Sequence, residues 1–159
     1  MAGSAANSQS PLTLVLPLRE GVDVPQLLAY LGQQNDNIRD WLDAIGTVHY
    51  ARFVLLDAST ENLKPAPDSR GPYKLAVITT YDGDFEMYIR AFTEHLSEVF
   101  NTLLGLTVGG DALRPVEDHV DELTAWVKEH DASQQGGRPP SQYGAYDYGV
   151  QDIKARFGE

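Results

Sequence analysis

The stretch LAVITTYDGDFEMYIRAF, residues 75–92, changes from strand to helix within a few residues and decides the fold. Up to Thr80 its residues are apolar or β-branched, as in a buried strand, whereas from Asp84 on apolar residues recur at helical spacing. Asp82 and Gly83 form a strong turn dipeptide, and Asp84 stands where a helix N-cap belongs. The stretch therefore predicts a strand, a tight turn and a capped helix.

A divalent metal site formed by Asp82, Asp84 and Glu86 is the alternative reading of these acids. Carboxylate oxygens suit calcium and magnesium, but a calcium loop places its glycine at the sixth position, not between the first two acids. The spacing of the acids therefore favours a turn and a helix cap over a metal site.

The residues before this stretch predict a strand, a helix and a second strand. The first strand is LTLVLPL, residues 12–18, and the second is VHYARFVLL, residues 48–56. Asp23 can cap the helix between them, and the polar patch GQQNDN, residues 32–37, can split that helix in two. About sixteen residues separate the second strand from the third, YKLAVITT, residues 73–80, which is long for a hairpin.

The residues after it predict a long helix to about Leu104, a loop at 105–114 and an inserted helix that starts at Pro115. Residues 132–141 have the composition of a linker, residues 142–148 suggest a short fourth strand, and residues 150–157 a closing helix. We expect residues 1–11 to be a disordered leader and residues 12–159 to form a single domain.

This order predicts an α+β fold: a ferredoxin-like βαββαβ sandwich with an inserted helix before the last strand and an antiparallel four-stranded sheet. Alternation along the strands assigns one set of residues to the helix-covered face: Leu12, Leu14, Leu16, Leu18, His49, Ala51, Phe53, Leu55, Tyr73, Leu75, Val77 and Thr79. The opposite set is mixed: Thr13, Val15, Pro17, Arg19, Tyr50, Arg52, Val54, Leu56, Lys74, Ala76, Ile78 and Thr80. Because that face is too apolar for solvent, we expect a second copy of the sheet to cover it in a homodimer.

The segments VHYARFVLLD, residues 48–57, KLAVITTYDGDFEMYI, residues 74–89, and YGAYDYGVQDIKA, residues 143–155, resemble the dimeric α/β-barrel superfamily. They are most similar to bacterial ferredoxin-like domains found alone or near haem peroxidases, and the likeness covers most of residues 12–156. The resemblance implies a dimeric α/β barrel. The superfamily includes cofactor-free monooxygenases, haem enzymes of the chlorite-dismutase and dye-decolorising types, and members with no known reaction. Haem is therefore an open alternative, although no motif supports it.

Composition narrows the classes of partner. With 23 acidic and 12 basic residues, the chain carries a net charge of -11, which repels a phosphate backbone or an anionic membrane. No apolar run approaches the ~20 residues that span a bilayer, and no export signal is visible. The absence of cysteine excludes disulfides and thiolate chemistry, and favours a reducing compartment. We predict a cytoplasmic protein that binds neither nucleic acid nor membranes.

Arg52 is the main candidate binding residue, because it lies in mid-strand on the mixed face and a guanidinium is seldom enclosed without an anionic partner. One interpretation is an ion pair with a protein carboxylate, including one of a partner chain. The other is a ligand anion or polarised carbonyl in a lumen lined by Tyr50, Arg52 and Thr80, which Tyr146 would join.

The histidines suggest no metal or haem set. His95 falls on the apolar stripe of its helix, which is typical of a hydrogen-bonded core histidine. His119 and His130 are too far apart in the sequence for a helical zinc pair.

Two functions follow as hypotheses. The first is a small-molecule-binding dimeric barrel, with oxygenase- or peroxidase-related chemistry as an extension. The second is a non-catalytic interaction module that docks on a redox enzyme or assembles with itself. No base–nucleophile pair or metal set can be assembled from the sequence, which favours binding over catalysis.

Overall fold

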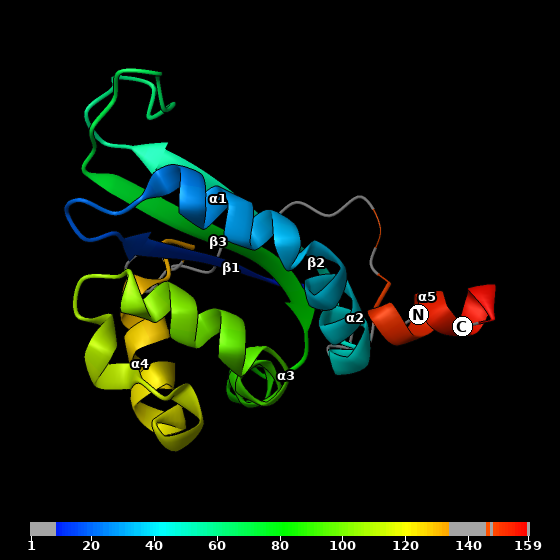
Figure 1. Cartoon of the computed structure of the whole chain (residues 1–159). Coiled ribbons are helices and arrows are strands. Elements are labelled where there is room, and N and C mark those ends of the chain that lie inside the picture. Colours follow the sequence, from blue (N-terminus) through cyan, green and yellow to red (C-terminus); the bar gives the residue numbers. More distant parts are fainter. Residues whose placement is uncertain (1–8, 134–145, 147, 159) are drawn as a thin grey trace.

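The computed structural model describes residues 9–133, 146 and 148–158 (Figure 1). The elements, with η for a 3₁₀ helix, are β1 (Gln9–Pro17), α1 (Val24–Gln33), α2 (Asn35–Ile45), β2 (Val48–Asp57), β3 (Tyr73–Asp82), α3 (Phe85–Gly105), η2 (Gly110–Leu113), η3 (Val116–Asp118), α4 (Val120–His130) and α5 (Val150–Phe157). The predicted α+β class is confirmed, and so is the split of the first helical region in two.

The described strands form one antiparallel sheet in the order β1-β3-β2, with β3 in the centre. β1 pairs with β3 from Gln9 opposite Asp82 to Pro17 opposite Lys74. β2 pairs with β3 from Asp57 opposite Tyr73 to Val48 opposite Tyr81, and a β-bulge interrupts the ladder between Val48 and Tyr50. The three predicted strands therefore exist and pair antiparallel.

Helices α1 to α4 lie against one face of the sheet, as Figure 1 shows. The core contains alternate residues of each strand together with the apolar stripes of these helices: Leu12, Leu14, Leu16, Leu75, Val77, Leu27, Ile38, Phe92, Leu103, Leu123 and Val127. Most of the predicted helix-facing set is thus confirmed. His49 is the exception, because the bulge turns its side chain to hydrogen-bond with Asp82 instead.

The other face of the sheet has the predicted mixed character. None of the helices α1 to α4 covers it (Figure 1). Partly exposed apolar side chains and exposed polar ones share this face: Val15, Val54, Leu56, Ile78, Tyr50, Arg52 and Lys74. We call these residues the open face.

The helix starts follow the predicted local chemistry. Asp84 accepts a hydrogen bond from the backbone N–H of Met87 at 3.0 Å and thereby caps α3. Asp23 caps α1 in the same way, through the N–H of Gln26 at 3.0 Å. Both caps were predicted and are confirmed.

The β1 edge differs from the expected fold. A ferredoxin-like sheet would place its fourth strand beside β1, and residues 142–148 were the candidate. Here the short segment 131–133 pairs with β1: Ala132 N donates to Thr13 O at 2.7 Å, and Thr13 N donates to the Asp131 carboxylate at 3.0 Å. Tyr146 and Tyr148 belong to no strand, while residues 142–145 and 147 lie outside the described residues.

The predicted bounds of the leader and of the inserted helix need correction, and most of the predicted linker lies outside the described residues. β1 begins at Gln9, so residues 9–11 of the predicted leader are strand, and residues 1–8 lie outside the described residues. The helix predicted from Pro115 begins as η3, and α4 starts only at Val120 because His119 has a non-helical backbone, with φ -130 and ψ 37. Residues 134–141 of the predicted linker are outside the described residues as well.

Candidate ligand-binding site

Three of the four predicted binding residues lie on the open side of the sheet. Tyr50 of β2 is opposite Thr80 of β3, and Arg52 is opposite Ile78. Tyr50 is half exposed, at 50%, and Arg52 is exposed. Arg52 forms no hydrogen bond or ion pair with any residue that the structure describes, so these residues do not supply the carboxylate of the ion-pair interpretation.

Thr80 and Tyr146 do not complete that site. Thr80 is only 3% exposed, so its hydroxyl is not open to a ligand in this chain. Tyr146 is 76% exposed and its carbonyl oxygen accepts a 3.5 Å hydrogen bond from Gln9. Gln9 is opposite Asp82, the last residue of β3, whereas Arg52 is opposite Ile78 in the middle of that strand. Tyr146, which contacts Gln9, therefore lies near the C-terminal end of β3 and not beside Arg52.

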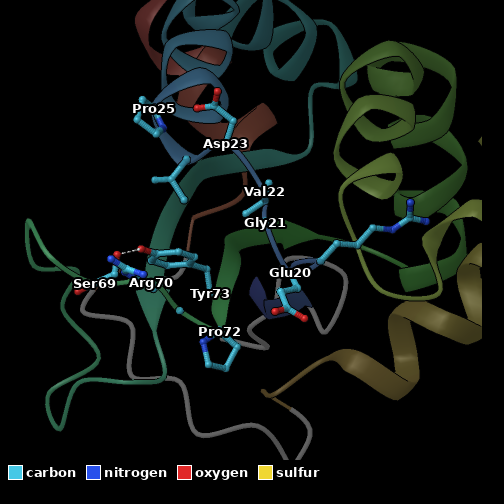
Figure 2. A pocket seen from close by; sticks show the side chains of 12 residues that line it. Glu20, Gly21, Val22, Asp23, Pro25, Ser69, Arg70, Pro72 and Tyr73 are labelled. Atoms are coloured by element: carbon cyan, nitrogen blue, oxygen red, sulfur yellow. Dashed lines mark hydrogen bonds between the residues drawn. The ribbon is translucent and has the colours of Figure 1, made fainter.

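One pocket, of about 600 Å³, lies between the loop that leads into α1 and the residues before β3 (Figure 2). Glu20, Asp23, Arg70 and Tyr73 are among its lining residues, and none of the predicted site residues is. Asp23 is occupied with the cap of α1, and the Tyr73 hydroxyl donates to the Ser69 carbonyl at 2.7 Å. We call it the Glu20 pocket.

A second pocket, of about 770 Å³, opens beside Tyr50 and is lined by residues of α2, β2 and α5. We call it the Tyr50 pocket. Its polar lining consists of Arg39, Asp40, Asp43, His49, Tyr50 and Lys154. It is thus a polar pocket that shares Tyr50 with the open face.

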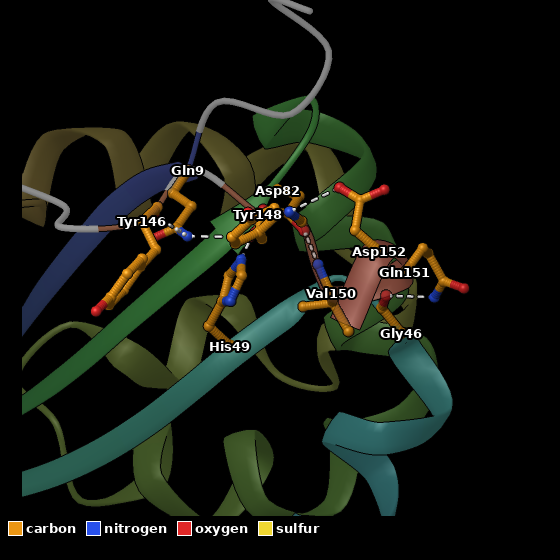
Figure 3. A network of polar contacts seen from close by, with 10 residues as sticks. Gln9, Gly46, His49, Asp82, Tyr146, Tyr148, Val150, Gln151 and Asp152 are labelled. Atoms are coloured by element: carbon orange, nitrogen blue, oxygen red, sulfur yellow. Dashed lines mark hydrogen bonds and ion pairs between the residues drawn. The ribbon is translucent and has the colours of Figure 1, made fainter. Parts of the chain in front are cut away.

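His49 and Asp82 form the centre of a polar network at this pocket (Figure 3). His49 Nε2 lies 2.8 Å from Asp82 Oδ1, and Asp82 Oδ2 accepts a hydrogen bond from the backbone N–H of Val150 at 2.7 Å. The two side chains are only 12% and 13% exposed. Asp82 therefore joins β2, β3 and α5, a role that the turn interpretation missed.

Further hydrogen bonds fix the start of α5 against the rest of the fold (Figure 3). Gln151 Nε2 donates to the carbonyl of Gly46 at 2.7 Å, and Gln9 Nε2 donates to the carbonyl of Tyr148 at 3.1 Å. In addition, Lys154 Nζ forms an ion pair with Asp43 at 2.6 Å. These contacts place Val150 and Lys154 in the wall of the Tyr50 pocket.

The charges of this pocket balance. Its cations are Arg39 and Lys154, and its anions are Asp40 and Asp43. Lys154 is paired with Asp43, whereas Arg39 and Asp40 form no ion pair with another residue of the described part of the chain. The lining therefore has no excess of either sign to select a charged ligand.

The other histidines lie elsewhere. His95 is half-buried on α3, and His130 Nδ1 lies 2.9 Å from the Trp126 carbonyl, its ring stacked on that indole at 3.9 Å. His119 is 3.9 Å from Glu122. Across residues 9–133, 146 and 148–158, no three His, Cys, Asp or Glu side chains converge to hold a metal ion.

In the part of the chain that the structure describes, no helix has both the length and the apolar character needed to cross a membrane. No protein-family model, curated protein or solved structure matches the chain.

Proposed function

We propose that this protein binds a small molecule in the Tyr50 pocket. The observation that carries the proposal is the convergence of a half-exposed tyrosine, a carboxylate-bound histidine and the Lys154–Asp43 ion pair on one pocket of about 770 Å³. Its volume lies within the roughly 300–1,000 Å³ that is typical of small-molecule sites. Asp82 connects β2 to α5, and the contacts of Gln151 and Lys154 connect α5 to α2.

The proposal includes a homodimer of the ferredoxin-like, dimeric α/β-barrel type. Its support is the strand order β1-β3-β2 and the open face, whose apolar side chains a second sheet would cover. In such a dimer, Arg52 would be enclosed close to Tyr50, and its guanidinium would need either a partner carboxylate or a ligand acceptor. Thr80 would contact the ligand only if its surroundings shift.

Oxygenase- or peroxidase-related chemistry is the extension that the family resemblance implies. The absorption spectrum of the purified protein tests it directly, since haem or flavin gives visible bands. A cytoplasmic location remains part of the same proposal.

The alternative function is an interaction module, and α5 supplies an observation in its favour. Ile153 and Phe157, four residues apart on this helix, are both exposed. Such an i,i+4 apolar pair can dock in the groove of a partner protein, and a redox enzyme is the partner that the resemblance suggests.

The test is a small-molecule screen by thermal shift on the wild type, Tyr50→Ala and the control Tyr148→Ala. Both tyrosines are exposed, but only Tyr50 lines the pocket. We expect compounds that stabilise the wild type and the control, with the stabilisation lost in Tyr50→Ala. A screen without hits, or hits that Tyr50→Ala leaves unchanged, would contradict binding at this pocket and favour the interaction module.

A further inference from the structure

The hydrogen bonds of Asp82 determine where the proton of His49 sits. An ionised carboxylate only accepts hydrogen bonds, and both Asp82 oxygens are used: one by His49 Nε2 at 2.8 Å, the other by the Val150 N–H at 2.7 Å. Nε2 must therefore carry a hydrogen. In a neutral imidazole the second nitrogen, Nδ1, then has a free lone pair and is an acceptor.

Nδ1 of His49 has no hydrogen-bond partner within the described ranges, and His49 is part of the lining of the Tyr50 pocket. Among the described residues, Asp57 Oδ2 is the only fully buried side-chain nitrogen or oxygen without a partner, so Nδ1 is open to solvent and a donor on a bound molecule can reach it. The adjacent Tyr50 ring offers an aromatic face, and the balanced charges around it favour a neutral molecule.

We propose that His49 Nδ1 accepts a hydrogen bond from the ligand of the Tyr50 pocket, and that Asp82 is the positioning residue that fixes the required tautomer. The ligand class is an uncharged molecule with an O–H or N–H donor on a planar ring. This inference rests on the proposed binding function of the same pocket and adds the chemistry that the ligand must present.

Asp82→Asn gives the sharpest consequence. An amide has one oxygen where the carboxylate has two, so it can accept from Val150 N–H only while its NH₂ group faces His49. The imidazole must then accept at Nε2 and carry its proton on Nδ1. The variant keeps the attachment of α5 but converts Nδ1 from an acceptor into a donor.

The first measurement is the tautomer itself, read from long-range ¹H–¹⁵N correlation spectra of the histidine rings. We expect the Nε2–H form of His49 in the wild type and the Nδ1–H form in Asp82→Asn. Asp84→Asn is the matched control, because it removes the same charge from the same turn while asparagine still caps α3. It should leave His49 in the Nε2–H form. An Nδ1–H form of His49 in the wild type would overturn the inference and leave the proposed function standing.

The second measurement titrates 4-methylphenol and its ether, 4-methylanisole, into ¹⁵N-labelled protein. We expect the phenol to shift the signals of His49, Tyr50 and Val150 and to bind about threefold to tenfold more tightly than the ether, the range of one neutral hydrogen bond. In Asp82→Asn that preference should disappear, because Nδ1 then donates.

Equal binding of the two probes at the pocket would overturn the inference but not the proposed function. Failure of both probes to bind there, when other fragments do bind there, would overturn the ligand class alone. Failure of every fragment to bind there would overturn both.

Discussion

At the scale of the residue, Arg52 is the side chain whose position is most informative about ligand binding. It is exposed in mid-strand on the open face and has no partner in the described part of its own chain. A side chain in that position contributes little to the stability of the isolated chain and is available to a ligand or to a partner chain. A substitution that removes its charge can therefore distinguish binding of a ligand from binding of a partner chain.

We predict that Arg52→Met keeps the fold, since methionine retains much of the apolar volume. If Arg52 serves a ligand, binding should weaken by about 1.5–3 kcal/mol, the range of a charge-assisted hydrogen bond. Thermal melts and titration of a hit from the screen measure the two effects, with Lys74→Met, also exposed on the open face, as the control. A destabilisation of roughly 3–5 kcal/mol would instead indicate a buried ion pair across the dimer.

Asp84 tests the cap of α3. Asp84→Ala should reduce the free energy of unfolding by about 1 kcal/mol because the N–H of Met87 loses its acceptor. Asp84→Ser should cost almost nothing, since serine is an equally good cap. Denaturant melts provide the measurement. Equal stability of the alanine variant and the wild type would show that the cap does not contribute.

Asp57 makes stability depend on pH. Hydrogen bonds from the Ser59 hydroxyl, at 2.6 Å, and the Ser59 N–H, at 2.8 Å, help to lower the pKa of this buried carboxyl. Because its folded pKa lies below the unfolded value of about 3.9, its contribution is complete above that value and is lost as the pH falls through the folded pKa.

Unfolding of the wild type and of Ser59→Ala across acidic pH checks this dependence. The stability advantage of the wild type over the variant should be constant above about pH 5 and shrink as the carboxyl becomes protonated. An advantage that grew toward low pH would contradict the assignment.

At the scale of the element, Asp82 attaches α5 to the sheet. Asp82→Ala leaves both His49 Nε2 and the Val150 N–H without their acceptor, and we expect a loss of about 1–3 kcal/mol of stability. Hydrogen exchange should accelerate first at the amide of Val150. Gln151→Ala removes a different contact of α5, to the Gly46 carbonyl, and serves as the comparison. Unchanged exchange at Val150 in Asp82→Ala would show that the carboxylate does not hold the helix.

The sequence could predict the elements themselves but not the contacts that hold them together. Periodicity and local caps give the strands and long helices because those signals depend on near neighbours, as at Asp23 and Asp84. The bulge at His49, the pairing of Asp131 with β1 and the placement of α5 depend on residues far apart in the chain. For that reason Tyr50 could be proposed as a site residue, while the His49 and Asp82 pair beside it could not.

At the scale of the whole molecule, the open face governs assembly. We predict a homodimer, because the apolar side chains of Val54 and Ile78 lie on a face that none of the helices α1 to α4 covers. Light scattering at micromolar concentration should give twice the mass of one chain for the wild type. For Ile78→Lys it should give the mass of a single chain. A wild-type monomer at that concentration would contradict the dimer and leave the Tyr50 pocket as a site of one chain.

The location of bound fragments in crystals distinguishes the Tyr50 pocket from the Glu20 pocket in one experiment. Fragments with an O–H or N–H donor should occupy the Tyr50 pocket, within hydrogen-bond distance of His49 Nδ1 and against the ring of Tyr50. Fragments that gather in the Glu20 pocket instead, or that leave the Tyr50 pocket empty throughout the set, would contradict the assignment of the ligand site.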